Sequence, residues 1–419
     1  MVLIKKFAKM LLEGKFFITI YNRLHNGILK IIKGLDFYSG FFFRWIASLF
    51  LTINKNQVVF YQCMGGKFIC NPKYVLEKLH ELMPTVDIYW VVKKEFYNKV
   101  ELPEYVNKVV NTSWKAYKIV LTSKVILDNG YTYQESGYIP KKNEQVYIQL
   151  WHGSLGLKRF DTDSIKSRLR AAIRCGKMTD YCVSNSKFET EKVYREVFWK
   201  HAEILEWGHP RNDILFIDNY EQKNKITEKI KTQYDIDDNS FIVLYAPTFR
   251  DKKNEKAYSL DIDKLITTVE FCTGKKCVLL WRYHFSSRSL DRKKNIKQVI
   301  DVTDYPDIQE LMLVADMGIT DYSSWICDFV LTKKPGFIFA PDISEYDTER
   351  GFYYPLTETP FSVAYDNEML RKNIMQFDFN EYEQNVDSYL KRLGCIENGK
   401  ASFMVANFII DILKGNVNK

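Results

Sequence analysis

The chain has 419 residues, of which 46% are hydrophobic and 27% are charged, and its formal net charge at pH 7 is +8. This composition excludes a disordered chain, a collagen-like chain and a small disulfide scaffold, and the length suggests two or three domains of about 150 residues each. The mean hydropathy of −0.27 excludes a polytopic membrane protein.

The eight cysteines form no Cys-x-x-Cys pair and no Cys/His spacing of the kind that binds zinc. We therefore expect reduced thiols, as in a cytosolic protein, and no structural zinc site.

The basic excess is concentrated at the N-terminus. Residues 1–55 contain nine Lys or Arg and two acidic residues, a net charge of +7, whereas the remaining 364 residues contain 51 basic and 50 acidic side chains. Within residues 1–35, apolar side chains recur every three or four positions, which predicts an amphipathic helix. A basic helix with Phe and Leu on its apolar face suits an anionic membrane surface, and the alternative is an ordinary helix packed on its own domain. We predict a membrane-associating arm over residues 1–55.

Two other roles for this arm are disfavoured. The very apolar stretch 41–53 has only 13 residues and contains Arg44, whereas about 20 apolar residues are needed to span a bilayer. No cleavage site typical of a signal peptide follows it. Nucleic acid is an unlikely partner class, since the rest of the chain has neither a basic excess nor a binding motif.

From residue 56 onward, short β-branched or aromatic runs alternate with helical patterns, which predicts an α/β fold. The expected strands are Val58–Gln62, Val86–Val92, Val125–Asn129, Val146–Trp151, Asp180–Ser184 and Ile204–Gly208 in a first series, and Phe241–Ala246, Lys276–Trp281, Val299–Val302, Met317–Thr320 and Gly336–Ala340 in a second.

A polar, lysine-rich segment at 217–240 separates the two series, and we place a domain boundary there. Two series of this kind predict two doubly wound domains, over residues 56–220 and 240–400, that face each other across a cleft. A closing helix within residues 400–419 is expected to pack back on the first domain.

The first group of candidate site residues follows the strand that ends at 151. His152 stands at the strand end, where an imidazole with a pKa of about 6.5 can accept a proton at neutral pH. Gly153 and Ser154 are small enough for backbone N–H groups to approach an anion, and Lys158 and Arg159 follow. We interpret this segment as an anion-binding turn, with a core or capping histidine as the alternative.

Cationic residues also stand at two later strand ends. Arg211 follows a Gly-x-Pro turn, and a guanidinium can make bidentate bonds to phosphate; its alternative role is a structural pairing with Asp213. Arg282 and His284 stand two residues apart after an expected strand and can both point into the cleft. The alternative for His284 is a solvated loop position.

A last group follows the strand Met317–Thr320. Asp321 ends this strand, and Ser323 and Ser324 open an expected helix that runs through residue 329. A helix N-terminus can hold a phosphate through free N–H groups, although serines there are often simple caps. Asp328, one turn inward, can accept bonds from a ribose or base, or orient the helix.

Other motifs are weaker indications of a site. Asp161-Thr162-Asp163 has the Asp-x-Asp pattern of metal-dependent transferases, but it does not follow a strand, so we interpret it as a loop, with a metal or acceptor role as the alternative. The chain has no Walker A, GxGxxG or GxSxG motif. Residues 164–178 carry five basic and no acidic side chains, which would bring a membrane close to the site unless this is a solvated face.

Together these segments resemble the CDP-glycerol:poly(glycerophosphate) glycerophosphotransferases, which build teichoic acids and related capsular polymers. The resemblance covers residues 145–355 well, and each motif is weak alone but distinctive in this order. The matching motifs are His152-Gly153-Ser154, Gly208-His209-Pro210-Arg211-Asn212-Asp213, Ala246-Pro247-Thr248-Phe249-Arg250-Asp251, Arg282-Tyr283-His284 and Thr320-Asp321-Tyr322-Ser323-Ser324, continuing through Lys334-Pro335, Pro341-Asp342 and Arg350-Gly351.

This chain departs from the family pattern at two places. After His152-Gly153 the family has Thr-Pro-Leu, where this chain has Ser154-Leu155-Gly156-Leu157, and Phe285 replaces the usual proline after His284.

The resemblance implies two Rossmann-like domains of the GT-B type at the cytoplasmic face of the membrane. It implies transfer of an alditol phosphate from CDP-glycerol or CDP-ribitol to a hydroxyl of a lipid-linked polymer, with release of CMP. Because Arg and His donors and a helix N-terminus can stabilise the phosphate charge, we expect no cofactor and no obligatory metal. An oligomer of identical chains is compatible with it. The alternatives are a GT-B glycosyltransferase that uses a nucleotide sugar, and a peripheral membrane protein that keeps a nucleotide-binding cleft without catalysis.

The resemblance also implies residue roles. His152 would be the general base, and His284 would stabilise the charged phosphates. The donor would be held by Gly153, Ser154, Arg211, Pro247, Thr248, Arg282, Ser323, Ser324 and Asp328. Weaker contacts with acceptor or phosphate would come from Lys158, Arg159 and Asp321.

Overall fold

The computed structural model describes residues 46, 49–135, 139–159, 166–196, 199–248, 259–283, 297–343 and 351–417, with only the backbone at 166–168. The expected N-terminal arm therefore lies almost entirely outside the described residues. So do Asp161-Thr162-Asp163 and His284.

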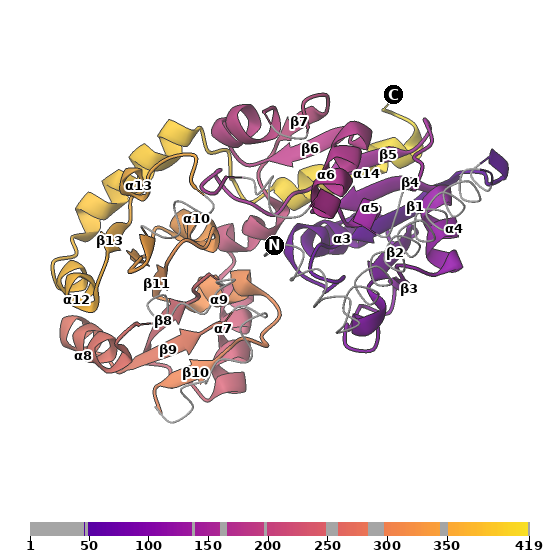
Figure 1. The fold of residues 1–419 in the computed structure, drawn as a ribbon. Coiled ribbons are helices and arrows are strands. Elements are labelled where there is room, and N and C mark those ends of the chain that lie inside the picture. The colour runs from indigo at the N-terminus through magenta and orange to yellow at the C-terminus, as the bar shows by residue number, and fades with distance from the viewer. Residues whose placement is uncertain are drawn as a thin grey trace, which may run out of the picture.

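The first half of the molecule is built on a seven-stranded parallel sheet with the order β3-β2-β1-β4-β5-β6-β7 (Figure 1). Its strands are β1 (Asn54–Tyr61), β2 (Asp87–Val92), β3 (Asn107–Val110), β4 (Ser123–Asp128), β5 (Val146–Gln149), β6 (Tyr181–Ser184) and β7 (Glu203–Glu206). The central strands are buried on both faces, as continuous apolar runs require in a parallel sheet.

Helices cover both faces of this sheet, and alternate residues of β1 show how. Val58 and Phe60 pack under α3 (Cys70–Leu82) and the C-terminal helix α14 (Ala401–Lys414). Val59 and Tyr61 point to the other face, where α4 (Trp114–Thr122), α5 (Thr132–Glu135) and α6 (Lys166–Met178) lie. Shorter helical turns complete this half: η1 (Lys94–Phe96), η2 (Glu189–Tyr194) and η3 (Pro210–Phe216).

The second half repeats the topology with six parallel strands in the order β10-β9-β8-β11-β12-β13. These are β8 (Phe241–Tyr245), β9 (Cys277–Trp281), β10 (Val299–Asp301), β11 (Met317–Thr320), β12 (Gly336–Phe339) and β13 (Ser362–Ala364). Helices α8 (Ile262–Thr273) and α12 (Asn367–Met375) cover one face. The other face is covered by α7 (Tyr220–Tyr234), α9 (Ile308–Val314), α10 (Trp325–Phe329) and α13 (Phe379–Leu393), with the turns η6 (Val330–Thr332) and η7 (Leu356–Glu358) nearby.

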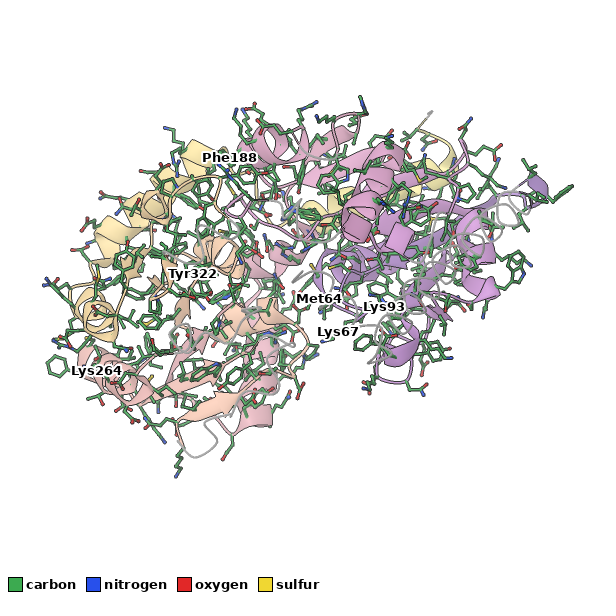
Figure 2. The ribbon with its side chains drawn as sticks, in the orientation of Figure 1. Met64, Lys67, Lys93, Phe188, Lys264 and Tyr322 are labelled. Carbon is green, nitrogen blue, oxygen red and sulfur yellow. The ribbon has the colours of Figure 1, made fainter. Side chains whose placement is uncertain are left out.

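In both sheets the strand order reverses beside the first strand, between β1 and β4 and between β8 and β11. Ligands of doubly wound sheets bind at such points, beyond the carboxyl ends of the strands. Met64 and Lys93, which follow the carboxyl ends of β1 and β2, lie on the side of the first half that faces the second (Figure 2). The predicted α/β fold with two parallel sheets is thus confirmed.

The structure differs from the sequence prediction in several elements. The short strands β3 and β13 were not predicted. The polar segment 217–240, in which the domain boundary is placed, also contains helix α7, which Asn219 caps and whose Ile230 is buried in the core of the second half. Residues Glu189–Tyr194, after β6, form the six-residue π-helix η2. Helix α7 is rich in lysine and buries little of its surface, so its sequence has the polar composition of a linker.

The chain returns to the first half at its end, where α14 packs beside α3 (Figure 1). Asp213 in η3 accepts hydrogen bonds from the backbone N–H groups of Ala401 (3.0 Å) and Ser402 (2.7 Å), so its carboxylate holds the N-terminus of α14. The structure therefore pairs Asp213 with α14 and not with Arg211.

All eight cysteines are free thiols. Within the described part of the chain, no helix has both the length and the apolar character that crossing a bilayer requires.

Candidate active site

His152 is presented by a strained turn after β5. Trp151 adopts a φ of +47°, in the left-handed region that a bulky residue rarely occupies. The side-chain amide of Asn71, at the start of α3, holds this turn by donating to the carbonyl oxygens of Leu150 (2.8 Å) and Trp151 (2.9 Å). The turn leaves His152 exposed to a pocket between the two halves.

The hydrogen bonding of His152 fixes its tautomer. Nδ1 lies 2.6 Å from the backbone oxygen of Asn129. Because a carbonyl oxygen can only accept, Nδ1 carries the hydrogen and Nε2 keeps its lone pair. The surrounding protein desolvates the imidazolium and, together with the charges of Arg211 and His209, lowers the pKa of His152 from 6.5 to about 4. The ring is therefore neutral at pH 7 and can accept a proton at Nε2.

The pocket beside His152 has a volume of about 190 Å³. Five of the predicted residues line it with His152: Gly153, Ser154, Lys158, Arg159 and, from the second half, Ser324. The remaining wall consists of Tyr131, Trp151, Gly156, Leu157, Glu189 and Val193. Ser324 stands at the N-cap of α10 without a side-chain capping bond, so its hydroxyl is not used by the helix.

The loop after His152 is joined directly to the second half. Lys158 forms an isolated antiparallel bridge with Phe352, and its ammonium lies 3.4 Å from the Thr248 hydroxyl. The N–H of Arg159 donates to the Gly351 carbonyl at 3.3 Å. Phe188, labelled in Figure 2, stacks edge-on against Tyr354 with 5.3 Å between ring centroids. The pocket wall therefore combines residues of both halves.

Arg211 and Asp328, both assigned to the donor by sequence, lie against each other and are almost fully buried. Arg211 Nε is 2.8 Å from Asp328 Oδ2, and Nη2 is 3.3 Å from Oδ1. Nη2 also donates to the Gly153 carbonyl at 2.6 Å. Asn212 and Gln309 donate to the same carboxylate at 3.0 and 3.2 Å. This ion pair therefore links α10 to the residue that follows His152.

Asp321 and Arg282 are likewise engaged with the backbone. Both carboxylate oxygens of Asp321 accept from the N–H of Thr248, at 2.8 and 3.0 Å, and so hold the loop after β8 that contains the buried Pro247. Arg282 donates to backbone carbonyls of the 302–306 segment, including that of Tyr305 at 2.5 Å, and burial lowers its pKa.

Asp307, directly after the 302–306 segment, makes a further contact between the halves. Asp307 accepts from the ammonium of Lys73 (2.8 Å) and the hydroxyl of Tyr74 (2.9 Å), both on α3. Arg282 thus supports the backbone that places this carboxylate. Ser323 stands half-buried beside Ser324.

A buried polar group, to whose members the sequence assigns no role, lies at the pocket. Glu189 lies 3.3 Å from His209, with both side chains fully enclosed. Glu397 accepts from the N–H of His209 (3.1 Å) and from the amides of Asn185 (3.1 Å) and Asn212 (2.7 Å). Burial, with Asp328 adding to it, raises the pKa of Glu397 to about 7, against the opposing effects of His209 and Asn212. The one available signal was the glutamate that follows β6 by five residues.

Among the residues that the structure describes, no group of three or more His, Cys, Asp or Glu side chains could hold a metal ion. The cationic groups at the pocket are the side chains of Lys158 and Arg159.

Known proteins resemble this chain over most of its length. Residues 42–411 match the family described as CDP-Glycerol:Poly(glycerophosphate) glycerophosphotransferase. A teichoic acid poly(glycerol phosphate) polymerase of Staphylococcus epidermidis is 32% identical over 382 residues, which are 85% of this chain and 50% of that protein. A protein of the same name from Bacillus spizizenii is 28% identical over 378 residues, 86% of this chain and 93% of that protein.

The fold is also close to a solved structure. A variant of the wall teichoic acid polymerase TagF soaked with CDPG aligns with a TM-score of 0.76 and 28% identity, covering 94% of this chain and 99% of that chain. The chain spans about half the length of the first curated relatives it matches.

The ion pair between Arg211 and Asp328 yields a stability prediction. Asp328→Asn leaves the Arg211 guanidinium buried without a counter-charge, and breaking a buried pair in this way costs about 3–5 kcal/mol. We expect the free energy of unfolding, measured by urea denaturation, to fall by about 3 kcal/mol. Glu368→Gln, which removes one carboxylate of an exposed ion pair with Lys264, is the matched control and should change stability little. Equal stability of Asp328→Asn and wild type would contradict a structural role for the pair.

Proposed function

The chain belongs to the CDP-glycerol:poly(glycerophosphate) glycerophosphotransferase family, and on this premise we propose that it transfers glycerol phosphate or ribitol phosphate from a CDP-alditol to a polymer hydroxyl. The supporting observation is His152, whose unprotonated Nε2 stands in a pocket lined from both halves. The acceptor oxygen attacks the distal phosphorus of the diphosphate, and a new P–O bond forms. The P–O bond to CMP breaks, and the acceptor proton goes to His152 Nε2.

The geometry gives His152 the properties that a general base needs. The Asn129 carbonyl orients the ring and keeps the hydrogen on Nδ1. The lowered pKa keeps Nε2 unprotonated at neutral pH. A positioned base of this kind contributes about 10²–10⁴ in rate, and the rest must come from positioning and charge stabilisation.

The phosphate charge is met by groups of both halves. We place the diphosphate between Lys158, Arg159 and the backbone of the Gly153-Ser154 turn on one side and Ser324 on the other. The Thr248 hydroxyl lies 3.4 Å from the Lys158 ammonium, and we keep its predicted contact with the donor.

The other predicted residues have two kinds of role in this proposal. Pro247, Ser323 and Arg282 do not line this pocket, and their predicted contacts with the donor would lie beyond it; His284 would add charge stabilisation as predicted. Arg211 and Asp328 act underneath the pocket, because their buried pair fixes the Gly153 carbonyl and α10 together.

A substitution of His152 tests the proposal. We expect His152→Ala to lower CMP release from CDP-glycerol or CDP-ribitol by about 10²–10⁴, because the acceptor hydroxyl loses its base. CMP release is measured with a polymer primer as acceptor, and the exposed His201→Ala variant is the matched control. Unchanged turnover in folded His152→Ala would remove His152 as the base, and UDP release from UDP-sugars without CMP release from either CDP-alditol would favour a glycosyltransferase.

The pH dependence of kcat/KM gives a second test. The base works only when neutral, so kcat/KM should be level at neutral pH and fall as the pH drops through the pKa of His152. Because that pKa is lowered, we expect the midpoint of the acid limb well below pH 6.5. An acid limb with its midpoint near pH 7 would contradict this expectation. If that limb disappeared in Glu397→Gln, Glu397 would be the group that causes it.

We further propose that the acceptor is lipid-linked and that the enzyme binds the cytoplasmic face of an anionic membrane. Supporting this are the +7 charge of residues 1–55 and the basic helix α6, which follows the His152 loop and on which Arg170 is exposed. We expect Arg170→Glu combined with Lys177→Glu to weaken sedimentation with phosphatidylglycerol vesicles, and a chain lacking residues 1–35 to lose most of it. Lys229→Glu on the second half is the control. Undiminished sedimentation of the folded variants would contradict membrane binding through these segments.

A further inference from the structure

Glu189 is a buried carboxylate at the pocket that the proposed chemistry has not yet used. It is about 1% exposed and lines the same pocket as His152. It begins η2, a π-helix in which the N–H of Arg195 donates to the Thr190 carbonyl five residues back, at 3.2 Å. π-Helical turns are rare and occur frequently at functional sites.

The carboxylate is held in place on several sides. Its Oε2 accepts from the N–H of Asn185 at 3.2 Å and lies 3.5 Å from the Ser184 hydroxyl. His209 Nε2 lies 3.3 Å away, and its ring is completely buried. A carboxylate enclosed in this way keeps its charge only with such partners.

Asn185 connects this carboxylate to the catalytic loop. Its side-chain amide donates to the Ser154 hydroxyl at 3.1 Å, and its side-chain oxygen accepts from the N–H of Leu155 at 3.3 Å. The position of Glu189 relative to His152 is therefore fixed through Ser154 and Leu155, two and three residues after the histidine.

Apart from Glu189, the charged side chains that act on His152 disfavour protonation of its ring. Arg211 and His209, from the η3 region, both disfavour a protonated His152, while Glu189 favours it. Lys158 and Arg159, on the loop itself, line the same pocket. Glu397, the other buried carboxylate nearby, is occupied by His209, Asn185 and Asn212 and does not line the pocket.

We propose that Glu189 is a positioning residue whose negative charge stabilises His152 as the imidazolium that forms when the ring takes the acceptor proton. This inference rests on the proposed function, in which His152 is the base. The proton moves from the acceptor hydroxyl to Nε2 of His152, and Glu189 stays ionised and takes no proton. Its charge matters most in the transition state, where positive charge develops on the ring.

A titration of the histidine ring tests this independently of turnover. The chain has six histidines, so ring resonances of labelled protein can be followed by NMR, and the signal missing in His152→Ala identifies His152. We expect Glu189→Gln to move the titration midpoint of His152 to lower pH by about one unit, since an opposite charge nearby favours the charged form. Glu191→Gln, at an exposed glutamate of the same helix, is the matched control and should leave the midpoint unchanged.

Kinetics supply the second readout. We expect Glu189→Gln to lower kcat for CMP release by about tenfold with little change in the KM for the CDP-alditol, and to move the acid limb downward. Glu189→Asp, which keeps the charge, should recover part of the loss. A purely structural role would lower activity without moving either pH midpoint.

The outcomes separate the two proposals. An unchanged His152 midpoint in folded Glu189→Gln overturns the role of Glu189, whatever the activity. If wild-type protein releases no CMP, the proposed function fails while the titration still reports on the charge pair. Should Glu189→Gln not fold, Glu189→Asp, which draws the charge back by one methylene group, should lower the midpoint of His152 by a smaller amount; an unchanged midpoint would overturn the inference.

Discussion

The arrangement of the site depends on one buried ion pair, between Arg211 of the first half and Asp328 of the second. Burying two charges is expensive unless each is fully hydrogen-bonded. Here Asn212 and Gln309 donate to the carboxylate, while Nη2 of the guanidinium also donates to the Gly153 carbonyl and Nη1 to Cys70 Sγ at 3.5 Å. The backbone N–H of Arg211 also donates to Asn71, which holds the strained turn before His152. Arg211 therefore connects α10, α3 and the catalytic loop through its side chain and its backbone.

Other polar contacts around η3 and α3 support this pair. Asp307 forms an ion pair with Lys73, and Glu397 accepts a hydrogen bond from the Asn212 amide. Asp213 accepts a hydrogen bond from the backbone at the N-terminus of α14. Polar contacts demand specific geometry, because a displaced partner leaves a desolvated group unsatisfied. The polar contacts between the two halves therefore fix their relative position more closely than hydrophobic contact alone would. This relative position brings Ser324 and Lys158 to one pocket.

Much of the fold could be predicted from sequence because its central strands are buried on both faces and appear as unbroken apolar runs, such as Val58–Tyr61. The edge strands β3 and β13, which were not predicted, are only four and three residues long and bury one residue each. In the site, position at a strand end identified His152. The partners of charged residues could not be identified in this way, because Arg211 and Asp328 are 117 positions apart. Sequence showed that both residues are suited to phosphate or ribose, but only the fold shows that they satisfy each other.

A site for a diphosphate faces an electrostatic conflict. The cations that attract the donor also disfavour the protonated form of a nearby base, which is the direction found for His152. This keeps the base unprotonated before reaction but opposes the positive charge that the ring must carry after proton transfer. The body of the protein cannot resolve the conflict through its overall charge, since residues 56–419 contain almost equal numbers of basic and acidic side chains. As proposed, a single buried carboxylate, Glu189, resolves it locally: its negative charge favours the imidazolium, and the backbone N–H of Asn185 holds it in place.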